Sequence, residues 1–365
     1  MKIIITGDFF VEHPESITID DSVKQLMKSC DYHIVNLEGP ITYTTTSEEP
    51  KKSGPRLKQT EGVVRVLEEL GTNMLTLANN HLMDYGEDGY RQTRTVLRGR
   101  YVLAGCGTWD EAYSLQIIER EGQKVGVLNF CEMQCGMLYD KWTQSKGAIG
   151  CAWVNHPTVD KLITESKSKV DYLVVIVHAG VELVKVPLPE WRDRYREMID
   201  IGCDAVIAHH PHVVQGYEIY KGKPIAYSLG NFCFQGGVKM GDDSWNIGAA
   251  AVLVLEQGRT NIILKGCQLD NNRLSLVKEK VWKDKIDELC HLLNEKYLSV
   301  VNDNCKRLMH NYWNIFAMGG IFAPEAFSLK NLARIPLHKY NHVHILNSIQ
   351  CESHRWLISR ALRNE

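Results

Sequence analysis

The sequence has no long apolar run, no excess of either charge and no paired-cysteine motif. Its apolar runs fall short of the roughly 20 residues that a membrane-spanning helix needs, and the run after Met1 is too short for a signal peptide. The net charge of -2 gives no argument for nucleic acid. We therefore expect a cytoplasmic protein, without direct membrane insertion and without a nucleic-acid partner.

Cysteine spacing excludes two further classes. There are eleven cysteines, an odd number, and the most closely spaced pair, Cys131 and Cys135, is four residues apart. A zinc-thiolate site lacks its paired ligands, and free thiols in a reducing compartment fit better than a disulfide framework. The chain also has no GxSxG motif for a serine nucleophile, and Gly105-Cys106-Gly107 does not have phosphate-loop spacing.

Short apolar runs alternate with helical periodicity in the first part of the chain. Strand, helix and strand in repetition predict parallel pairing through crossover connections. The predicted strands are Lys2–Thr6, Tyr32–Asn36, Asn73–Ala78, Tyr101–Ala104, Lys124–Asn129, Asp171–Val177 and Asp204–Ala208. The predicted helices are Ser22–Ser29, Glu61–Leu70, Tyr90–Arg98, Thr158–Ser168 and Glu190–Ile201.

The pattern changes after Val213, where two strand-turn-strand segments follow each other. They are Val213–Ile219 with Ile225–Leu229, and Ala249–Leu255 with Asn261–Leu264. Antiparallel hairpins here indicate a second sheet packed face to face on the first. From residue 272 helical periodicity dominates, in Val277–Val301, Asn304–Ile315 and His354–Leu362. We predict an α/β two-sheet sandwich flanked by helices (1–271), with a helical C-terminal extension (272–365).

Polar residues follow several of the predicted strands. Asp8, Glu38, Asn80 with His81, His178, and the run His209-His210-Pro211-His212 all stand at carboxyl ends of apolar runs. Ligands bind at such strand ends in open α/β sheets. Carboxylate, amide and imidazole groups suit divalent transition metals. Alternation along an extended segment favours His210 and His212 as ligands, on the side opposite His209.

The segment from Ile41 to Lys58 lacks periodicity and carries several cations, Lys51 and Arg56 among them. A loop this long is either functional or simply solvated. Two interpretations stay open: a mobile solvated loop, or a basic lid over an anionic substrate.

Six motifs in chain order resemble those of the CapA family of capsule and poly-γ-glutamate synthesis proteins, whose fold is related to the calcineurin-like metallophosphoesterases. The resemblance covers residues 1 to about 270. The motifs are Gly7-Asp8, Asn36-Leu37-Glu38-Gly39-Pro40, Ala78-Asn79-Asn80-His81-Leu82-Met83-Asp84-Tyr85-Gly86, His178-Ala179-Gly180-Val181-Glu182, His210-Pro211-His212 and Tyr227-Ser228-Leu229-Gly230-Asn231-Phe232.

The resemblance implies roles for these residues around one or two divalent ions: manganese is favoured, with zinc, iron or magnesium as alternatives. Glu38 would bridge the two ions, and His81 would be the general acid. The implied metal ligands are Asp8, Glu38, Asn80, His178, His210 and His212. Asp84 would hold one tautomer of His81, Glu182 would orient a ligand or contact substrate, and the candidate substrate contacts are Asn79, Lys51, Arg56, Tyr227 and Asn231.

One departure from the family pattern bears on the metal count. The superfamily's first motif is Asp-x-His, but Phe10 stands in the histidine position, so the first metal loses one imidazole. Ala208 and Ala179 also replace residues that are common in the family, glycine and tryptophan.

Three functions follow as hypotheses. The first is hydrolysis of a phosphoester by a metal-bound hydroxide, on a phosphorylated glycan or another cell-envelope precursor. The second is amide hydrolysis or transfer on poly-γ-glutamate at the same site, and the third is a non-catalytic scaffold for polysaccharide assembly. The helical extension could support a homodimer or bind another partner.

Overall fold

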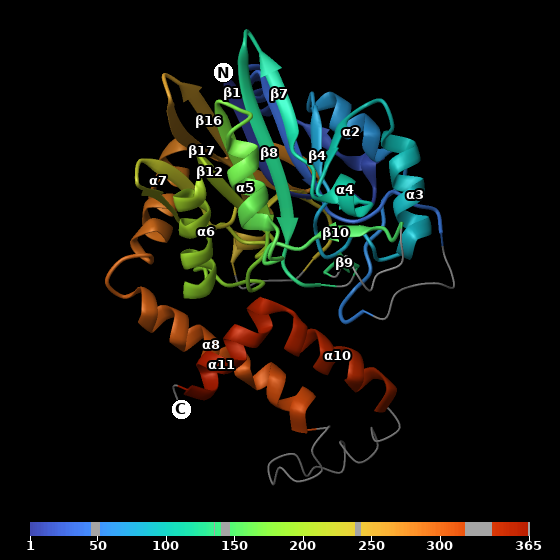
Figure 1. Cartoon of the computed structure of the whole chain (residues 1–365), viewed down its shortest axis with the longest axis vertical. Coiled ribbons are helices and arrows are strands. Elements are labelled where there is room, and N and C mark those ends of the chain that lie inside the picture. The colour runs from blue at the N-terminus through green and yellow to red at the C-terminus, as the bar shows by residue number, and fades with distance from the viewer. Residues whose placement is uncertain (45–51, 135, 140–146, 238–241, 318–337, 364–365) are drawn as a thin grey trace.

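Two β-sheets pack face to face in the computed structural model, which describes residues 1–44, 52–134, 136–139, 147–237, 242–317 and 338–363 (Figure 1). Within these residues the first sheet has nine strands, in the order β2-β18-β17-β16-β1-β3-β4-β5, with β15 paired to β1. They are β1 (Lys2–Phe10), β2 (Thr18–Ile19), β3 (Tyr32–Leu37), β4 (Met74–Thr76), β5 (Val102–Ala104), β15 (Asn231–Phe234), β16 (Ile247–Glu256), β17 (Arg259–Asp270) and β18 (Arg273–Leu276).

The second sheet has six described strands, in the order β13-β14-β12-β11-β8-β7. They are β7 (Gln116–Arg120), β8 (Gln123–Cys131), β11 (Tyr172–His178), β12 (Ala205–His209), β13 (Tyr217–Tyr220) and β14 (Lys223–Ala226). A small third sheet joins β6 (Cys106–Gly107), β9 (Met137–Leu138) and β10 (Gly150–Ala152).

Parallel pairing dominates the centre of both sheets. β1, β3, β4 and β5 are mutually parallel, as are β8, β11, β12 and β14, whereas β16, β17 and β18 pair antiparallel. The carboxyl ends of the parallel strands therefore share one edge in each sheet. The predicted combination of crossover strands and later hairpins is confirmed.

The core lies between the sheets. Fully buried side chains of the first sheet, such as Ile3, Ile5 and Ile34, pack in one apolar cluster with Val174 and Ile176 of the second. Burying each of them contributes about 1.5–3 kcal/mol, because the apolar surface is removed from water.

Helices cover the outer faces of both sheets. α1 (Asp21–Lys28), α2 (Val63–Glu69) and α3 (Gly86–Leu97) pack on the first sheet. α4 (Trp109–Ala112), α5 (Val159–Lys167) and α6 (Pro189–Ile201) pack on the second. Two 3₁₀ turns, Pro14–Ser16 and Asp243–Asn246, complete the described elements of this region.

The C-terminal helices are α7 (Glu279–His291), α8 (Tyr297–Ala317), α10 (His338–Gln350) and α11 (Glu352–Arg363). The first of these helices begins at Glu279, after β18 has added a strand to the first sheet. The single helix expected over Val277–Val301 is two helices, separated by a turn in which Asn294 accepts a hydrogen bond from the Tyr297 amide. Asparagine favours turns over helix interiors.

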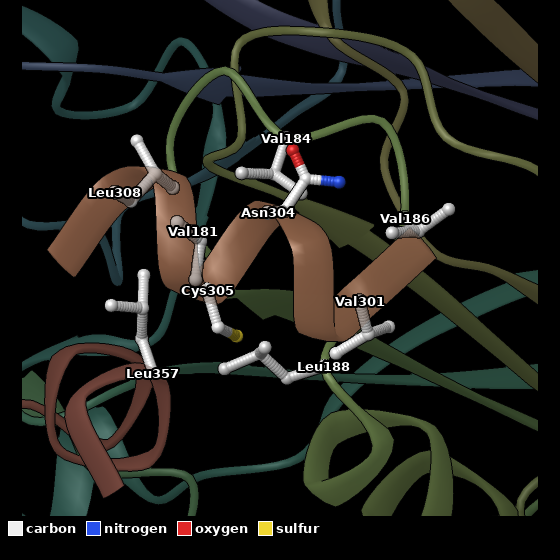
Figure 2. A pocket seen from close by; sticks show the side chains of 9 residues that line it. All are labelled: Val181, Val184, Val186, Leu188, Val301, Asn304, Cys305, Leu308 and Leu357. Atoms are coloured by element: carbon white, nitrogen blue, oxygen red, sulfur yellow. The ribbon is translucent and has the colours of Figure 1, made fainter. Parts of the chain in front are cut away.

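α8, α10 and α11 lie together at the end of the molecule toward which β8 points (Figure 1). Figure 2 shows how α8 docks: Val301, Cys305 and Leu308 meet the 181–188 loop, and Leu357 of α11 closes the same apolar contact. None of the described helices is long and apolar enough to span a bilayer.

Candidate metal centre

Asp8 lies where β1 changes partners. Up to Thr6 the strand pairs with β16, and from Asp8 it pairs with β15. Gly7 allows this exchange, because a Cβ added there would lie 2.0 Å from the carbonyl oxygen of Gly230. The Asp8 amide donates to that same oxygen at 2.8 Å, and its carboxylate is fully buried. The close approach of two backbones thus fixes the position of the carboxylate.

Three neutral donors converge beside it, from the loop after β4, the end of β11 and the loop after β12. His178 Nε2 lies 2.9 Å from Asn80 Oδ1 and 3.1 Å from His210 Nδ1. Burial lowers the pKa of both imidazoles, that of His210 to about 3. Neutral rings keep a lone pair, as metal ligation requires. The group is therefore suited to a divalent cation.

A second group shares the same space. Ligand atoms of Asp8, Glu38 and His212 lie within 4.8 Å of one another. His212 Nε2 is 3.6 Å from Glu38 Oε1, while its Nδ1 is 2.9 Å from Asn231 Oδ1. Asn231 Nδ2 donates to the Trp245 carbonyl, so Oδ1 is the atom facing the ring and accepts from Nδ1–H. This leaves the Nε2 lone pair of His212 directed at Glu38.

The surroundings of the Glu38 carboxylate indicate that these residues suit metal ions. Its side chain is fully buried, yet neither carboxylate oxygen has a hydrogen-bond partner among the described residues. Burial and the nearby Asp8 carboxylate raise its pKa well above the ordinary range. A buried carboxylate without donors is costly, and cations on either side would stabilise its ionised form. The donor set therefore fits divalent ions, and the Glu38 carboxylate would be one of the groups that hold them.

His81 lies at the rim of this cluster and is held by Asp84. His81 Nδ1 donates to Asp84 Oδ2 at 2.7 Å, and its Nε2 lies 3.8 Å from Glu38 Oε1. Burial, followed by the Lys52 ammonium, lowers the pKa of the ring. Asp84 also accepts from Lys52 Nζ and, at 2.8 Å, from the Leu57 amide. The predicted pairing of Asp84 with His81 is present, with Nε2 facing the cluster.

The histidine run adopts a different backbone from the extended one assumed from the sequence. His210 and His212 have φ of 99° and 56°, in the left-handed region that non-glycine residues rarely occupy. The alternation argument is therefore wrong in its geometry, although both side chains do reach the cluster. His209 points into the core, with Nε2 2.9 Å from the Thr6 carbonyl oxygen. Such strain concentrates at functional sites.

Glu182 lies against the outer side of the cluster. One of its carboxylate oxygens falls within 4.8 Å of nitrogens of His210 and His212, although the residue is exposed. Desolvation opposes ionisation, but His210 and His212 outweigh it and lower the pKa. Glu182 is thus an ionised carboxylate on the solvent side of the two imidazoles.

Several predicted substrate contacts lie elsewhere. Tyr227 is buried and donates its hydroxyl to Glu218 at 2.5 Å, in a network with Arg192 and Arg196. Asn79 uses its side chain inside the protein, accepting from the His81 and Leu82 amides and donating to the Leu37 carbonyl. Tyr227 and Asn79 therefore support the fold. Arg56 is exposed, and Lys51 lies outside the described residues. Asn231 is at the cluster, as the partner of His212.

Asn36, Lys52 and Glu132 are described residues at the cluster that are absent from the set predicted by sequence; the Asn36 amide donates to Asp8 Oδ1 at 2.7 Å. Lys52, buried beside His81, adjoins the predicted Lys51 in the same basic segment. Glu132, fully buried, follows β8 and lies 3.5 Å from His210 Nε2. Burial, and then Glu352, raises the pKa of Glu132 to about 8. The other site residues are predicted because they directly follow a predicted strand. Glu132 would be predicted in the same way if the strand that ends at Asn129 were extended.

The position that lacks the expected imidazole is filled by aromatic side chains. Phe10 packs 5.1 Å from Phe234 in a cluster with Trp245. The ring of His212 lies 5.0 Å from both Phe234 and Trp245. The group of Asp8, Glu38 and His212 therefore has three protein ligands, and the apolar side chains of Phe10, Phe234 and Trp245 pack beside it.

Two bacterial proteins are similar to this chain in sequence. The "PGA biosynthesis protein CapA" of Bacillus subtilis (strain 168) is 30% identical over 59% of this chain and 56% of its own length. The "Capsule biosynthesis protein CapA" of Bacillus anthracis is 29% identical over 76% of this chain and 72% of its own. The chain thus spans little more than half of the B. subtilis relative.

Among solved structures, TT1561 of Thermus thermophilus aligns over 72% of this chain and 97% of its own, at 9% identity and a TM-score of 0.39. The profile of the family "Bacterial capsule synthesis protein PGA_cap" matches residues 5–236, which contain every predicted metal ligand. This chain belongs to the PGA_cap family of bacterial capsule synthesis proteins.

Proposed function

We propose that this protein is a divalent-metal-dependent hydrolase of a phosphoester, acting on a phosphorylated glycan or other cell-envelope precursor. The observation that carries the proposal is the buried Glu38 carboxylate, without hydrogen-bond partners in the described part of the chain and with His212 Nε2 at 3.6 Å and His178 Nε2 at 4.0 Å from its Oε1. Bound divalent ions, with manganese favoured, would supply a Lewis acid that binds phosphoryl oxygens and acidifies water.

The protein's own residues supply positioning and proton transfer. Asn80, His178 and His210 would form one ligand group, Asp8 with His212 would form the other, and Glu38 lies within 4.0 Å of a histidine of each. His81 Nε2 faces the same space, and the Asp84 carboxylate, which accepts from Nδ1–H, opposes the lowering of the ring's pKa by burial and by Lys52. A proton on Nε2 would thus be directed at a leaving oxygen, the geometry of a general acid. Lys52, an ammonium beside this dyad, favours anionic substrates.

The second candidate function uses the same metal site but acts on an amide bond instead of a phosphoester. The name of the B. subtilis relative refers to PGA biosynthesis, which supports amide hydrolysis or transfer on poly-γ-glutamate as the reaction. The aromatic wall at Phe10 supports a third candidate, a scaffold with a weakened first metal site.

The described cysteines are all free thiols, which supports work on precursors in the cytoplasm. A homodimer through the C-terminal helices remains part of the proposal.

The test is a substrate screen on chelator-stripped protein with and without Mn²⁺. The panel contains a phosphomonoester, a phosphodiester and a γ-glutamyl anilide. We expect phosphoester turnover that depends on Mn²⁺. In His81→Gln the turnover should fall by about 100-fold or more, because general acid catalysis contributes about 10²–10⁴-fold. His13→Gln, at an exposed histidine, is the control and should keep full activity.

Three outcomes separate the candidates. Turnover of the anilide alone would establish the amide reaction. Manganese binding without turnover of any member would favour the scaffold. Phosphoester turnover that survives both chelation and Glu38→Ala would refute the proposed centre.

A further inference from the structure

Glu132 is a buried carboxylate that the proposed reaction does not use. It follows β8, is fully buried and reaches two parts of the molecule at once. Oε1 accepts from the Gly180 amide at 3.1 Å and lies 3.5 Å from His210 Nε2. A carboxyl group buried in such a place needs hydrogen-bond partners, because nothing else replaces its lost hydration.

The two ring nitrogens of His210 have different surroundings. Nδ1 faces the ligand group, 3.1 Å from His178 Nε2, which itself lies 2.9 Å from Asn80 Oδ1. Nε2 points the other way, to Glu132. Only one nitrogen of a neutral imidazole carries a proton, and a ligand histidine usually donates that proton to a carboxylate behind it. A proton on Nε2 would leave the Nδ1 lone pair for the cation.

The C-terminal helices hold the other oxygen of this carboxylate. Glu132 Oε2 accepts from the Ser353 amide, in the first turn of α11, at 3.1 Å and from the Cys351 thiol at 3.3 Å. Glu352 fixes the same contact from the opposite side: it accepts from the Met133 amide at 2.7 Å and from Trp153 Nε1 at 2.6 Å. Free amides of a helix N-terminus stabilise a carboxylate.

Apolar packing keeps α11 at this place. Leu357 of α11 and Cys305 of α8 contact Val181 and Leu188, in the loop that follows Gly180 (Figure 2). Arg360 of α11 adds an ion pair with Glu190 at 2.9 Å. The contact between α11 and the end of β8 is thus supported by several neighbouring interactions.

We propose that Glu132 is a positioning residue for the metal ligand His210, and that the first turn of α11 completes the metal centre by holding Glu132. The C-terminal helices lie outside residues 5–236 that match the family, yet they reach the ligand through this carboxylate. This inference rests on the proposed metal centre and adds to it a structural dependence on the C-terminal region.

The experiment compares Glu132→Gln with Glu352→Gln in the full chain. Both residues are buried carboxylates at the same contact, but only Glu132 reaches His210. Calorimetric titration of each apoprotein with Mn²⁺ should show a Kd about 10–100-fold higher for Glu132→Gln than for wild type. Glu352→Gln should lose thermal stability and raise Kd by clearly less than Glu132→Gln, because it loosens the turn that holds Glu132 but leaves in place the carboxylate that orients His210.

A second readout is the tautomer of His210, from long-range ¹⁵N–¹H spectra of the zinc-loaded wild type. We expect the proton on Nε2 and the metal on Nδ1. The opposite tautomer overturns the inference even if Glu132→Gln does not fold. An equal loss of Mn²⁺ affinity in the two variants also overturns it, because Glu132 would then be structural only. If wild type itself binds no Mn²⁺, the proposed metal centre fails, and this inference fails with it.

Discussion

Glu38 is the residue on which the proposed chemistry and the stability of the fold make opposite demands. Its carboxylate is fully buried, and no donor among the described residues reaches either oxygen. Removing such a group from water without partners costs free energy, because nothing replaces the lost hydration. A cluster built to hold cations therefore lowers the stability of the metal-free protein.

We predict that Glu38→Met stabilises the apoprotein and abolishes metal binding. Methionine fills a similar volume without a buried charge, so the free energy of unfolding should rise by about 1–3 kcal/mol. Urea denaturation of metal-free protein measures the stability, and Mn²⁺ titration measures the binding. Glu15→Met, at an exposed carboxylate, should change neither. A destabilised Glu38→Met apoprotein would mean that the carboxylate has an internal partner.

Individual residues of the site can be predicted from the sequence where they follow the end of a predicted strand. Apolar runs precede each of the predicted ligands Asp8, Glu38, Asn80, His178, His210 and His212, and the structure brings all six together. Lys52 is not predictable in this way, because it comes from an aperiodic segment and its contact with Asp84 depends on how that segment folds back. Tyr227 belongs to a family motif, but Glu218 takes its hydroxyl.

At the scale of elements, β3 and α2 are joined through a buried histidine. His33 Nδ1 lies 3.2 Å from the Leu70 carbonyl, at the end of α2, and Nε2 lies 3.5 Å from the Thr6 hydroxyl of β1. Because Leu70 offers only an acceptor, Nδ1–H donates to it. Burial lowers the pKa of His33 to about 4. The ring is therefore neutral in the native protein at every pH at which the protein is expected to work.

This shift predicts a pH dependence of stability. Between pH 4 and pH 6.5 the unfolded chain binds a proton at His33 that the native protein does not, so the free energy of unfolding falls as the pH falls through this window. Above pH 6.5 the contribution is fully present. From about pH 7 to about pH 5 the loss due to His33 should be about 2 kcal/mol.

His33→Gln tests it, since the amide can still donate to Leu70 but does not titrate. Urea denaturation of the apoprotein at about pH 7 and about pH 5 should show a loss about 2 kcal/mol smaller in His33→Gln than in wild type. His13→Gln, at an exposed histidine, should keep the wild-type pH dependence. Equal losses in wild type and His33→Gln would refute the assignment.

The elements themselves are largely predictable from the sequence, and their pairing is not. The seven predicted core strands all occur, and the expected helices among α1 to α6 are present with ends shifted by a few residues. Periodicity reports which face of a segment is buried. It carries no information on partners, so nothing in the pattern shows that β1 pairs with β16 in one half and with β15 in the other.

At the scale of the whole molecule, the C-terminal helices pack on the rest of the chain. Val301 and Met309 of α8, with Leu357 and Ala361 of α11, belong to the same buried cluster as the outer face of the second sheet. The division at residue 271 remains a prediction, and so does a homodimer through these helices. α10 leaves Leu346 and Ile349 exposed, where a second copy would have apolar surface to cover.

The measurement that tests the central claim most directly is anomalous diffraction at the manganese edge from crystals of the full chain grown with Mn²⁺. We expect a peak within bonding distance of Asn80 Oδ1, His178 Nε2 and His210 Nδ1, with the Glu38 carboxylate also next to the peak. A second peak between Asp8, Glu38 and His212 would establish two ions. No peak in this cluster at saturating Mn²⁺, or a peak bound by other residues only, would contradict the account.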